Sequence, residues 1–311
     1  MRSESVFVVT IAIFFIITPS VLAGTIVSWG SDAHGEVSDT PVGNDFTDIA
    51  AGSDYSLALK SSGSIVAWGL DGSSGRVSHA PTGSDFTDIA AGYGHGLALK
   101  SNGSIVSWGD NSYGEVSNTP TGSDFTAIAG GGWHSMALKS DGSIVSWGRD
   151  NYGQISNTPT GSDFIDIAAG YCHNLALKSD GSIVAWGLND EEQVSNVPTD
   201  SDFIDIAAGG HHSLALRSDG TILSWGYDYY NQIGDTPTGS NFIDIVGADW
   251  HSIALKSDGS IVSWGRDVSG NVSNVPTGSN FVDIAGCGHH SLALTPEPVT
   301  LLLFGLGGIF L

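Results

Sequence analysis

Six histidines recur at a nearly fixed interval and are the first residues to consider for chemistry. Each stands two places before an apolar-Ala-Leu segment, and a tyrosine holds the first position of the column. Imidazole is a common zinc ligand, but a zinc site needs three or four ligands that converge on one point. A residue present in every unit more often meets a need of every unit, such as a hydrogen bond to a neighbouring backbone carbonyl. We therefore expect a structural column, with no metal and no cofactor, at Tyr55, His95, His134, His173, His212, His251 and His290.

Two acidic residues and two cysteines are the other reactive candidates. Glu191 and Glu192 adjoin and could supply half of an acid–base pair, although adjacent carboxylates on a loop are usually solvated. Cys172 and Cys287 are the only cysteines and fall in distant repeats. A disulfide needs Cα atoms within about 7 Å, so free thiols are expected. No convergent catalytic set results, and the chain is expected not to be an enzyme.

These candidates are positioned by an internal repeat. A Trp-Gly pair recurs at intervals of 39, 40, 39, 39, 39 and 39 residues, and a Phe-x-x-Ile column keeps step with it. A fixed period of this length indicates a solenoid, a propeller or an array. The tryptophans are Trp29, Trp68, Trp108, Trp147, Trp186, Trp225 and Trp264.

One repeat predicts four strands. Phe125 to Ala129, Ser135 to Lys139 and Ser143 to Trp147 are strand-like, and Asp141-Gly142 is a residue pair preferred in tight hairpin turns. Gln154 to Ser156 is expected to be a short, polar fourth strand at the outer edge.

Seven such units predict an all-β fold, a seven-bladed β-propeller of four-stranded blades. Large residues (Trp147, Leu138) are expected on one face of a blade and small ones (Ser146, Ala137) on the other, so that blades stack. The repeats begin at a third strand, 25–30, and stop after a second strand, 291–295. A mixed N- and C-terminal blade is therefore expected to close the ring.

The aromatic residues outside these columns predict a binding face. Strand direction places the loop between strands one and two on the same rim as the loop between strands three and four. Basic residues collect on the opposite rim, at Lys60, Lys100, Lys139, Lys178, Arg217 and Lys256. Tyr55 falls in the first kind of loop as well. Binding surfaces favour Tyr and Trp, although such residues can also fill gaps between blades. The predicted binding residues are Tyr93, Tyr113, Trp133, Tyr152, Tyr171, Tyr227, Tyr229, Tyr230 and Trp250.

The charge balance excludes one class of partner. The chain has 10 basic and 33 acidic residues, a net charge of -23. DNA and anionic lipid would be repelled, so a phosphate-backbone partner is not expected.

The run Ala207 to Gly226, Ala-Ala-Gly-x-x-His-Ser-Leu-Ala-Leu-x-x-Asp-Gly-x-x-x-x-Trp-Gly, resembles the regulator of chromosome condensation repeat. The likeness covers nearly all of residues 24–295. The compact copies are similar to the bacterial version in secreted proteins, which includes a propeller that inhibits β-lactamases. Nothing matches the nuclear family's basic chromatin-binding segment, so nucleotide exchange and DNA binding are not implied.

Both termini predict export. Residues 1–23 combine Arg2, an apolar run from Val6 to Ile17 and small residues at Ala23, which is typical of a cleaved secretory signal. Residues 296–311 begin with Pro296-Glu297-Pro298 and resemble a PEP-CTERM sorting signal. That resemblance implies processing by an exosortase and transient membrane contact of the tail. The 13 apolar residues that follow are too few to span a bilayer unaided.

The sequence thus predicts a signal peptide at 1–23, a propeller at 24–295 and a sorting tail at 296–311. The function expected is that of a secreted, non-catalytic binding or scaffold propeller of the bacterial envelope or matrix, holding a protein or polysaccharide through its aromatic rim. The alternatives are a secreted carbohydrate-active enzyme and a protein inhibitor of a secreted enzyme.

Overall fold

A computed structural model of the protein describes residues 23–296. The predicted signal peptide and sorting tail therefore lie outside the described residues, apart from Ala23 and Pro296. Within the described range, no helix has the length and apolar character needed to cross a membrane.

The described residues form 21 strands in antiparallel pairs. Each repeat contributes three strands, which correspond closely to the first three predicted. The first strands are β2 (Phe46–Ala51), β5 (Phe86–Ala91), β8 (Phe125–Gly130), β11 (Phe164–Ala169), β14 (Phe203–Ala208), β17 (Phe242–Gly247) and β20 (Asp283–Cys287). The second strands are β3 (Tyr55–Lys60), β6 (His95–Lys100), β9 (His134–Lys139), β12 (His173–Lys178), β15 (His212–Arg217), β18 (His251–Lys256) and β21 (His290–Pro296). The third strands are β1 (Gly24–Gly30), β4 (Ile65–Gly69), β7 (Ile105–Gly109), β10 (Ile144–Gly148), β13 (Ile183–Gly187), β16 (Ile222–Gly226) and β19 (Ile261–Gly265).

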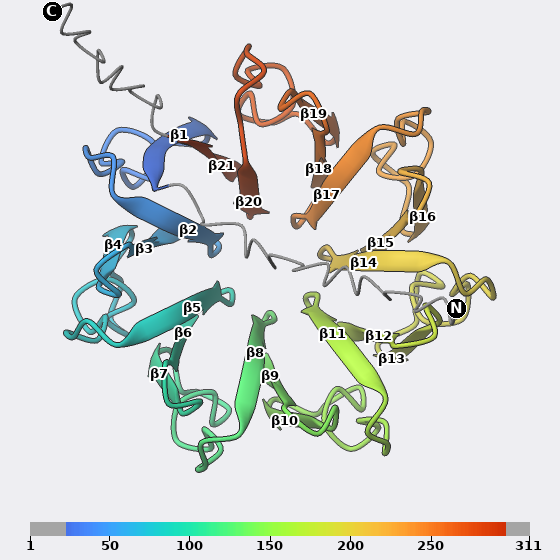
Figure 1. Ribbon diagram of the computed structural model, residues 1–311, viewed down its shortest axis with the longest axis horizontal. Helices are drawn as coiled ribbons and strands as arrows, with labels where there is room; N and C mark the ends of the chain where they lie inside the picture. The colour runs from blue at the N-terminus through green and yellow to red at the C-terminus, as the bar shows by residue number, and fades with distance from the viewer. Residues whose placement is uncertain (1–22, 297–311) are drawn as a thin grey trace, which may run out of the picture.

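The sheets stand radially around a central axis, with the first strand of each repeat innermost (Figure 1). Five sheets have three strands, and a sixth has the order β20-β21-β1-β2-β3-β4. In that sheet β1 runs beside β21 over its whole length, from Gly24 opposite Pro296 to Gly30 opposite His290. It meets β2 only where Gly24 pairs with Phe46. The N-terminal strand thus completes the sheet formed by the C-terminal strands.

The predicted fourth strand is wrong. Gln154, Ile155 and Ser156 lie in a run of turns. Asp150 Oδ1 accepts hydrogen bonds from the amides of Ile155 (2.9 Å) and Ser156 (3.0 Å). The buried Gln154 side chain folds back to accept the amide of Tyr152 (2.8 Å). The amides of Ile155 and Ser156 are satisfied within the loop and are therefore not available for a sheet ladder.

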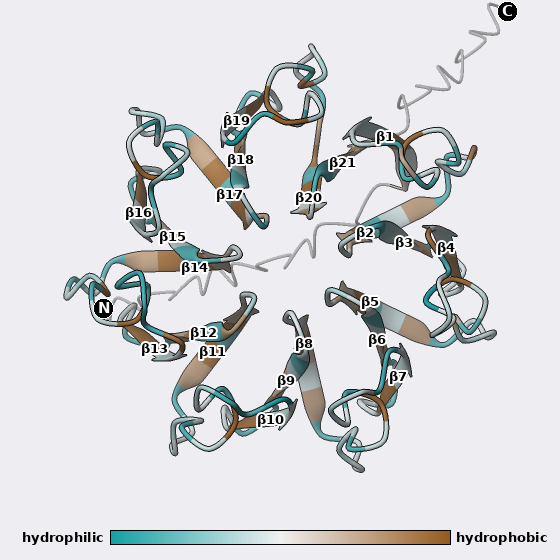
Figure 2. Cartoon of the chain, turned by 180° about the vertical axis from the view of Figure 1, so that it is seen from behind, coloured by the Kyte–Doolittle hydropathy of each residue, from teal (hydrophilic) through white to brown (hydrophobic). Residues whose placement is uncertain are grey.

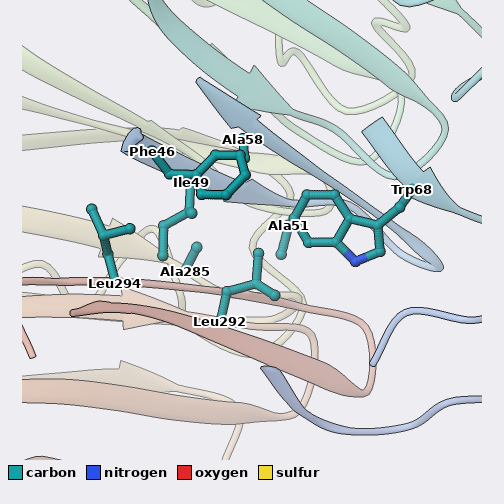
Figure 3. Close-up of a cluster of buried hydrophobic side chains, with 8 residues drawn as sticks. All are labelled: Phe46, Ile49, Ala51, Ala58, Trp68, Ala285, Leu292 and Leu294. Atoms are coloured by element: carbon teal, nitrogen blue, oxygen red, sulfur yellow. The ribbon is translucent and has the colours of Figure 1, made fainter. Parts of the chain in front are cut away.

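The hydrophobic core lies between neighbouring sheets. In Figure 3, Phe46, Ile49 and Trp68 from the first repeat pack against Leu292 and Leu294 from the last. Every core cluster repeats this arrangement, with Leu, Met or Ile side chains of one sheet facing the Phe, Ile, Ala and Trp of the next. Among the innermost strands, β11, β14 and β17 are the more hydrophobic (brown in Figure 2), and β2, β5 and β8 are less so.

Trp147 and Leu138 were expected on the same face of a blade, and this prediction is wrong. In the β9–β10 register, Trp147 is opposite Ser135, whereas Leu138 is opposite Ile144. Alternation along a strand then places Trp147 on the face of Ala137 and Leu138 on the other face. Each sheet therefore presents a tryptophan face to one neighbour and a leucine face to the other. The indole also donates to the preceding repeat, from Trp147 Nε1 to the Glu115 carbonyl (2.8 Å).

Candidate binding surface

The loops that leave the innermost strands bring four of the nine predicted binding residues into one aromatic arc. Ring centroids are 5.9 Å apart for Tyr93 and Trp133, and 4.5 Å for Trp133 and Tyr171. His211 continues the series at 5.9 Å from Tyr171 and 5.7 Å from Trp250. These spacings are typical of interacting aromatic pairs.

The loops after the third strands extend this arc. Tyr227 lies 5.7 Å from Trp250, and Tyr230 lies 6.0 Å from it. Tyr229 lies 4.9 Å from Tyr230 and is 77% exposed. The prediction that both kinds of loop share one rim is therefore confirmed. We define the aromatic arc as Tyr93, Trp133, Tyr171, His211, Tyr227, Tyr229, Tyr230 and Trp250.

An arginine stacks on the arc near each end. The Arg149 guanidinium lies 4.7 Å from the Trp133 ring and 5.0 Å from the Tyr113 ring. Arg266 lies 4.6 Å from the Tyr230 ring and 6.0 Å from the Trp250 ring. Cation–π contact fixes both planar groups against the aromatic surface. Tyr113 thus joins the arc through Arg149.

Two further tyrosines of the sequence analysis stand apart. Tyr152 is 46% exposed, and no aromatic contact links it to another described residue. Tyr55 does not lie on the rim, because it is fully buried in a core cluster. Its hydroxyl donates toward the carbonyls of Gly92 and His95 in the next repeat. The placement of Tyr55 on the rim was therefore wrong.

The histidine column joins neighbouring repeats. His134 Nε2 bonds Asn174 Oδ1 (2.6 Å), and the other five bond a serine of the next repeat, such as His95 with Ser135 (2.7 Å). His290 bonds Ser56 (2.7 Å) and so links the last repeat to the first. The partners are side chains rather than the backbone carbonyls expected. No group of three metal-ligating residues occurs in the described range.

Burial lowers the pKa of every histidine in this column. The pKa is about 3 for His173 and His251, and about 4 for His95, His134, His212 and His290. Desolvation is the largest cause in each case, because a charged imidazole loses its hydration inside the protein. The rings are therefore neutral at physiological pH.

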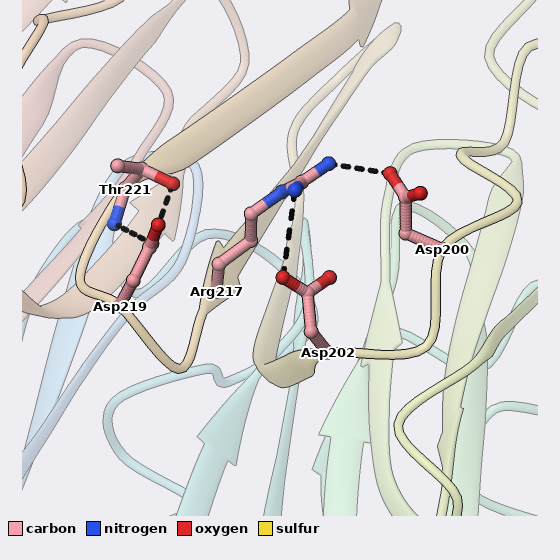
Figure 4. A network of polar contacts seen from close by, with 5 residues as sticks. All are labelled: Asp200, Asp202, Arg217, Asp219 and Thr221. Carbon is pink, nitrogen blue, oxygen red and sulfur yellow. Dashed lines mark hydrogen bonds and ion pairs between the residues drawn. The ribbon is translucent and has the colours of Figure 1, made fainter.

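The cations on the opposite rim are paired. Lys139 lies 3.2 Å from Asp124 and 5.7 Å from the centre of the Phe125 ring, and the other lysines repeat one or both contacts. Arg217 contacts Asp200 and Asp202, as Figure 4 shows. Such exposed pairs contribute little to stability. Five of the six basic residues on this rim thus have a carboxylate partner, and Lys256 has only the Phe242 ring among the described residues.

Three features escaped the sequence analysis. One is a row of exposed apolar residues after the Phe column: Ile165, Ile204, Ile243 and Val282. The second is a hollow of about 440 Å³ beside the aromatic arc. The third is a column of aspartates on the innermost strands, visible in the sequence as Phe-x-Asp-Ile, at Asp48, Asp88, Asp166, Asp205, Asp244 and Asp283.

The innermost aspartates have raised pKa values. Burial is the largest cause, and neighbouring carboxylates of the column add to it at Asp205, whose pKa is raised to about 8. Asp205 Oδ1 accepts the amide of Ile206 (2.8 Å). The side chains are half-buried on the innermost strands, and protein surrounds them closely enough to disfavour charge.

Cys172 and Cys287 are both free thiols, as expected. Glu191 and Glu192 are exposed, and Glu192 Oε2 accepts a hydrogen bond from Asn196 Nδ2 (2.6 Å). This contact stabilises the loop in which both glutamates lie.

Comparison with known proteins agrees with this geometry. The regulator of chromosome condensation (RCC1) repeat model matches residues 46–76, 86–115, 125–154, 164–193 and 203–232. The structure is similar to Prp20p of Saccharomyces cerevisiae, with a TM-score of 0.73, 19% identity, and coverage of 90% of this chain and 93% of that one. Human WBSCR16 has a TM-score of 0.71 and 17% identity, with coverage of 88% of this chain and 99% of that one. The ectodomain of the Physcomitrella patens receptor kinase CR4 has a TM-score of 0.68 and 20% identity, with coverage of 80% of this chain and 69% of that one.

At these identities the structural likeness establishes the fold alone. The comparison with curated protein sequences finds no match. The chain therefore carries RCC1-type repeats, and these repeats together with the similar structures support an RCC1-type repeat β-propeller.

Proposed function

We propose that this chain is a non-catalytic binding propeller that holds a protein or polymer against its aromatic arc. The observation that carries the proposal is the continuous contact from Tyr93 to Trp250, with half-buried rings, the exposed Tyr229 and an arginine near each end. Tyr, Trp and Arg are enriched at residues that dominate binding energy. The opposite rim offers cations that already have partners.

The relatives support a protein partner. The RCC1-like propeller is a protein-binding scaffold fold, and Prp20p is described by its binding to Gsp1p and histones and by its complex with Kap60. Those partners belong to Prp20p. The net charge of -23 makes a nucleic-acid partner unfavourable for this chain.

The binding face requires a rigid scaffold. We propose that the scaffold is a ring of seven blades closed by β1 and β21. The β1–β21 register, the His290–Ser56 bond and the Trp29 Nε1 bond to the Asn271 carbonyl (3.0 Å) support closure.

Export to the cell envelope is also part of the proposal. It rests on the secretory pattern of residues 1–23 and on the Pro296-Glu297-Pro298 motif, which we propose is processed by an exosortase. Fractionation of the native host should find the protein in the envelope or medium, with residues 1–23 removed. Recovery of the uncleaved chain from the cytoplasm would contradict export.

Replacing a tryptophan of the arc should abolish partner capture. We expect Trp133→Ala and Trp250→Ala each to weaken capture from native envelope extract about thirtyfold, since loss of a hot-spot tryptophan typically costs about 2 kcal/mol or more. Pull-down with the parent and each variant as bait measures this.

Lys139→Ala and Lys178→Ala on the opposite rim are the controls and should change capture little. The tryptophan variants must keep the parent's unfolding midpoint. Equal loss from both rims, or loss only together with destabilisation, would contradict the proposal. A captured secreted enzyme that loses activity would identify the chain as an inhibitor.

A further inference from the structure

A hollow of about 440 Å³ opens at the axis, on the side of the aromatic arc. Tyr93, Tyr171 and Asp249 line both this hollow and the narrow, Gly- and Ala-lined passage of about 80 Å³ beside it. The hollow therefore stands at the mouth of the central channel. Its volume lies within the range of about 300–1,000 Å³ that is usual for small-ligand sites.

The walls of the hollow combine aromatic rings with carboxylates. Tyr93, Tyr171 and Trp250 supply the rings, and Asp54 and Asp249 supply the acids. Two histidines, His211 and His289, complete the side-chain lining together with Ser53. No lysine or arginine belongs to the lining formed by the described residues. Aromatic faces and carboxylates both attract cations, and together they form the usual setting for recognising an ammonium or guanidinium group.

The two carboxylates differ in their partners. Asp54 Oδ2 accepts the Ser53 hydroxyl (3.0 Å) and lies 3.8 Å from Arg76 Nη1, so part of its charge is already balanced. Asp249 Oδ1 has the thiol of Cys287 at 3.6 Å, and a thiol is a weak donor. Burial raises the pKa of Asp249, and the contacts with Cys287, the Gly288 backbone and His289 only partly offset this. An incoming cation beside Asp249 would favour the charged form of its carboxyl.

We propose that this hollow binds the cationic end of a lysine or arginine side chain that a protein partner presents at the centre of the aromatic arc. The inference rests on the proposed function, because the arc would hold the surrounding surface of that partner. It adds the class of group that occupies the centre. A neutral sugar would stack on the same rings but would not require the carboxylates.

The test uses N-acetyl-lysine amide and N-acetyl-arginine amide as probes, with N-acetyl-norleucine amide as the uncharged analogue. Titration followed by tryptophan fluorescence and by calorimetry should show saturable binding of the two cationic amides. We expect the norleucine amide to bind at least tenfold more weakly, and salt to weaken the cationic amides only. Equal binding of norleucine amide, or saturation by maltose instead of the amides, would overturn the inference.

Asp249→Asn is the decisive variant and should weaken binding of the lysine amide at least tenfold. Glu191→Gln removes the same charge from an exposed loop position outside the hollow and is the matched control. Asp54→Asn serves as a second variant if Asp249→Asn lowers the unfolding midpoint. If Glu191→Gln loses as much affinity for the lysine amide, the effect comes from net charge alone, and the proposed site is overturned.

The two proposals fail differently. Trp133 does not line the hollow, so Trp133→Ala should keep amide binding while losing partner capture. Absence of amide binding in the parent would overturn the cationic site but leave the aromatic arc to be judged by capture alone.

Discussion

Deletion of residues 24–35 should lower the melting temperature of the protein by about 10 °C or more. The deletion removes all of β1, whose residues pair with β21 along its whole length, and it removes Trp29 from a core cluster. Loss of one buried tryptophan side chain alone costs about 3–5 kcal/mol, and each kcal/mol shifts the midpoint of a domain this size by about 2–4 °C. Thermal unfolding followed by circular dichroism measures the change.

A circular permutant is the matched control. Gly24 lies opposite Pro296, so an Asn-Gly turn can join these ends, with new termini opened in the loop at residues 38–39. This permutant keeps every strand and should unfold close to the parent. If the deleted chain melts like the parent, β1 does not hold the ring closed. If the permutant melts like the deleted chain, the position of the chain termini, and not the loss of β1, causes the lower melting temperature.

The architecture could be predicted because every repeat has the same physical task. Trp147 and its equivalents fill the space between sheets, and Asp141-Gly142 and its equivalents form hairpin turns. Columns that recur in each unit therefore indicate both the strands and their order. The pairing of the first strand with the last followed from the positions at which the repeats begin and end.

The local errors came from interactions that a pattern of apolar residues does not reveal. Gln154, Ile155 and Ser156 have the composition of an edge strand, but Asp150 and the Gln154 side chain satisfy the local amides. The faces of Trp147 and Leu138 depend on register, and a shift of one residue exchanges the faces of a strand. Side-chain capping and strand register both depend on contacts that form only in the folded protein.

The candidate site was only partly predictable for the same reason. Loop position and strand direction placed Tyr93, Trp133 and Trp250 on one rim. They did not show that Tyr55 turns into the core, because its column is otherwise histidine and its partners belong to the next repeat. The hollow at Asp249 arises where loops of several repeats converge on the axis, and no single repeat contains it.

The innermost aspartates make stability depend on pH in a direction that one substitution can isolate. The pKa of Asp205 is about 8 in the folded protein, against an ordinary value of 3.8. Between these values the folded state binds a proton that the unfolded state does not. Stability contributed by this group is therefore lost as pH rises toward 8. The buried histidines act in the opposite direction, since their lowered pKa values make stability fall as pH drops below about 6.5.

Asp205→Asn should remove the cost of the buried charge and keep the acceptor for the Ile206 amide. Ala127 occupies the equivalent position in another repeat, which shows that a neutral residue fits. We expect the variant to exceed the parent's stability at pH 9 by on the order of 2 kcal/mol, after allowance for screening by solvent, and to lose most of this advantage by pH 5. Denaturant unfolding of both proteins at each pH measures the difference, and the comparison cancels the histidine contribution.

Asp180→Asn is the control, because the Asp180 carboxylate is exposed and its pKa is lowered by the hydroxyl and amide of Ser182. Ionisation there favours the folded state, so the same substitution should bring no gain at pH 9. A gain for Asp205→Asn that is equal at pH 5 and pH 9 would mean that the amide packs better and that charge is not the cause. No gain at pH 9 would mean that the aspartates around the axis ionise without cost, and that water reaches the channel freely.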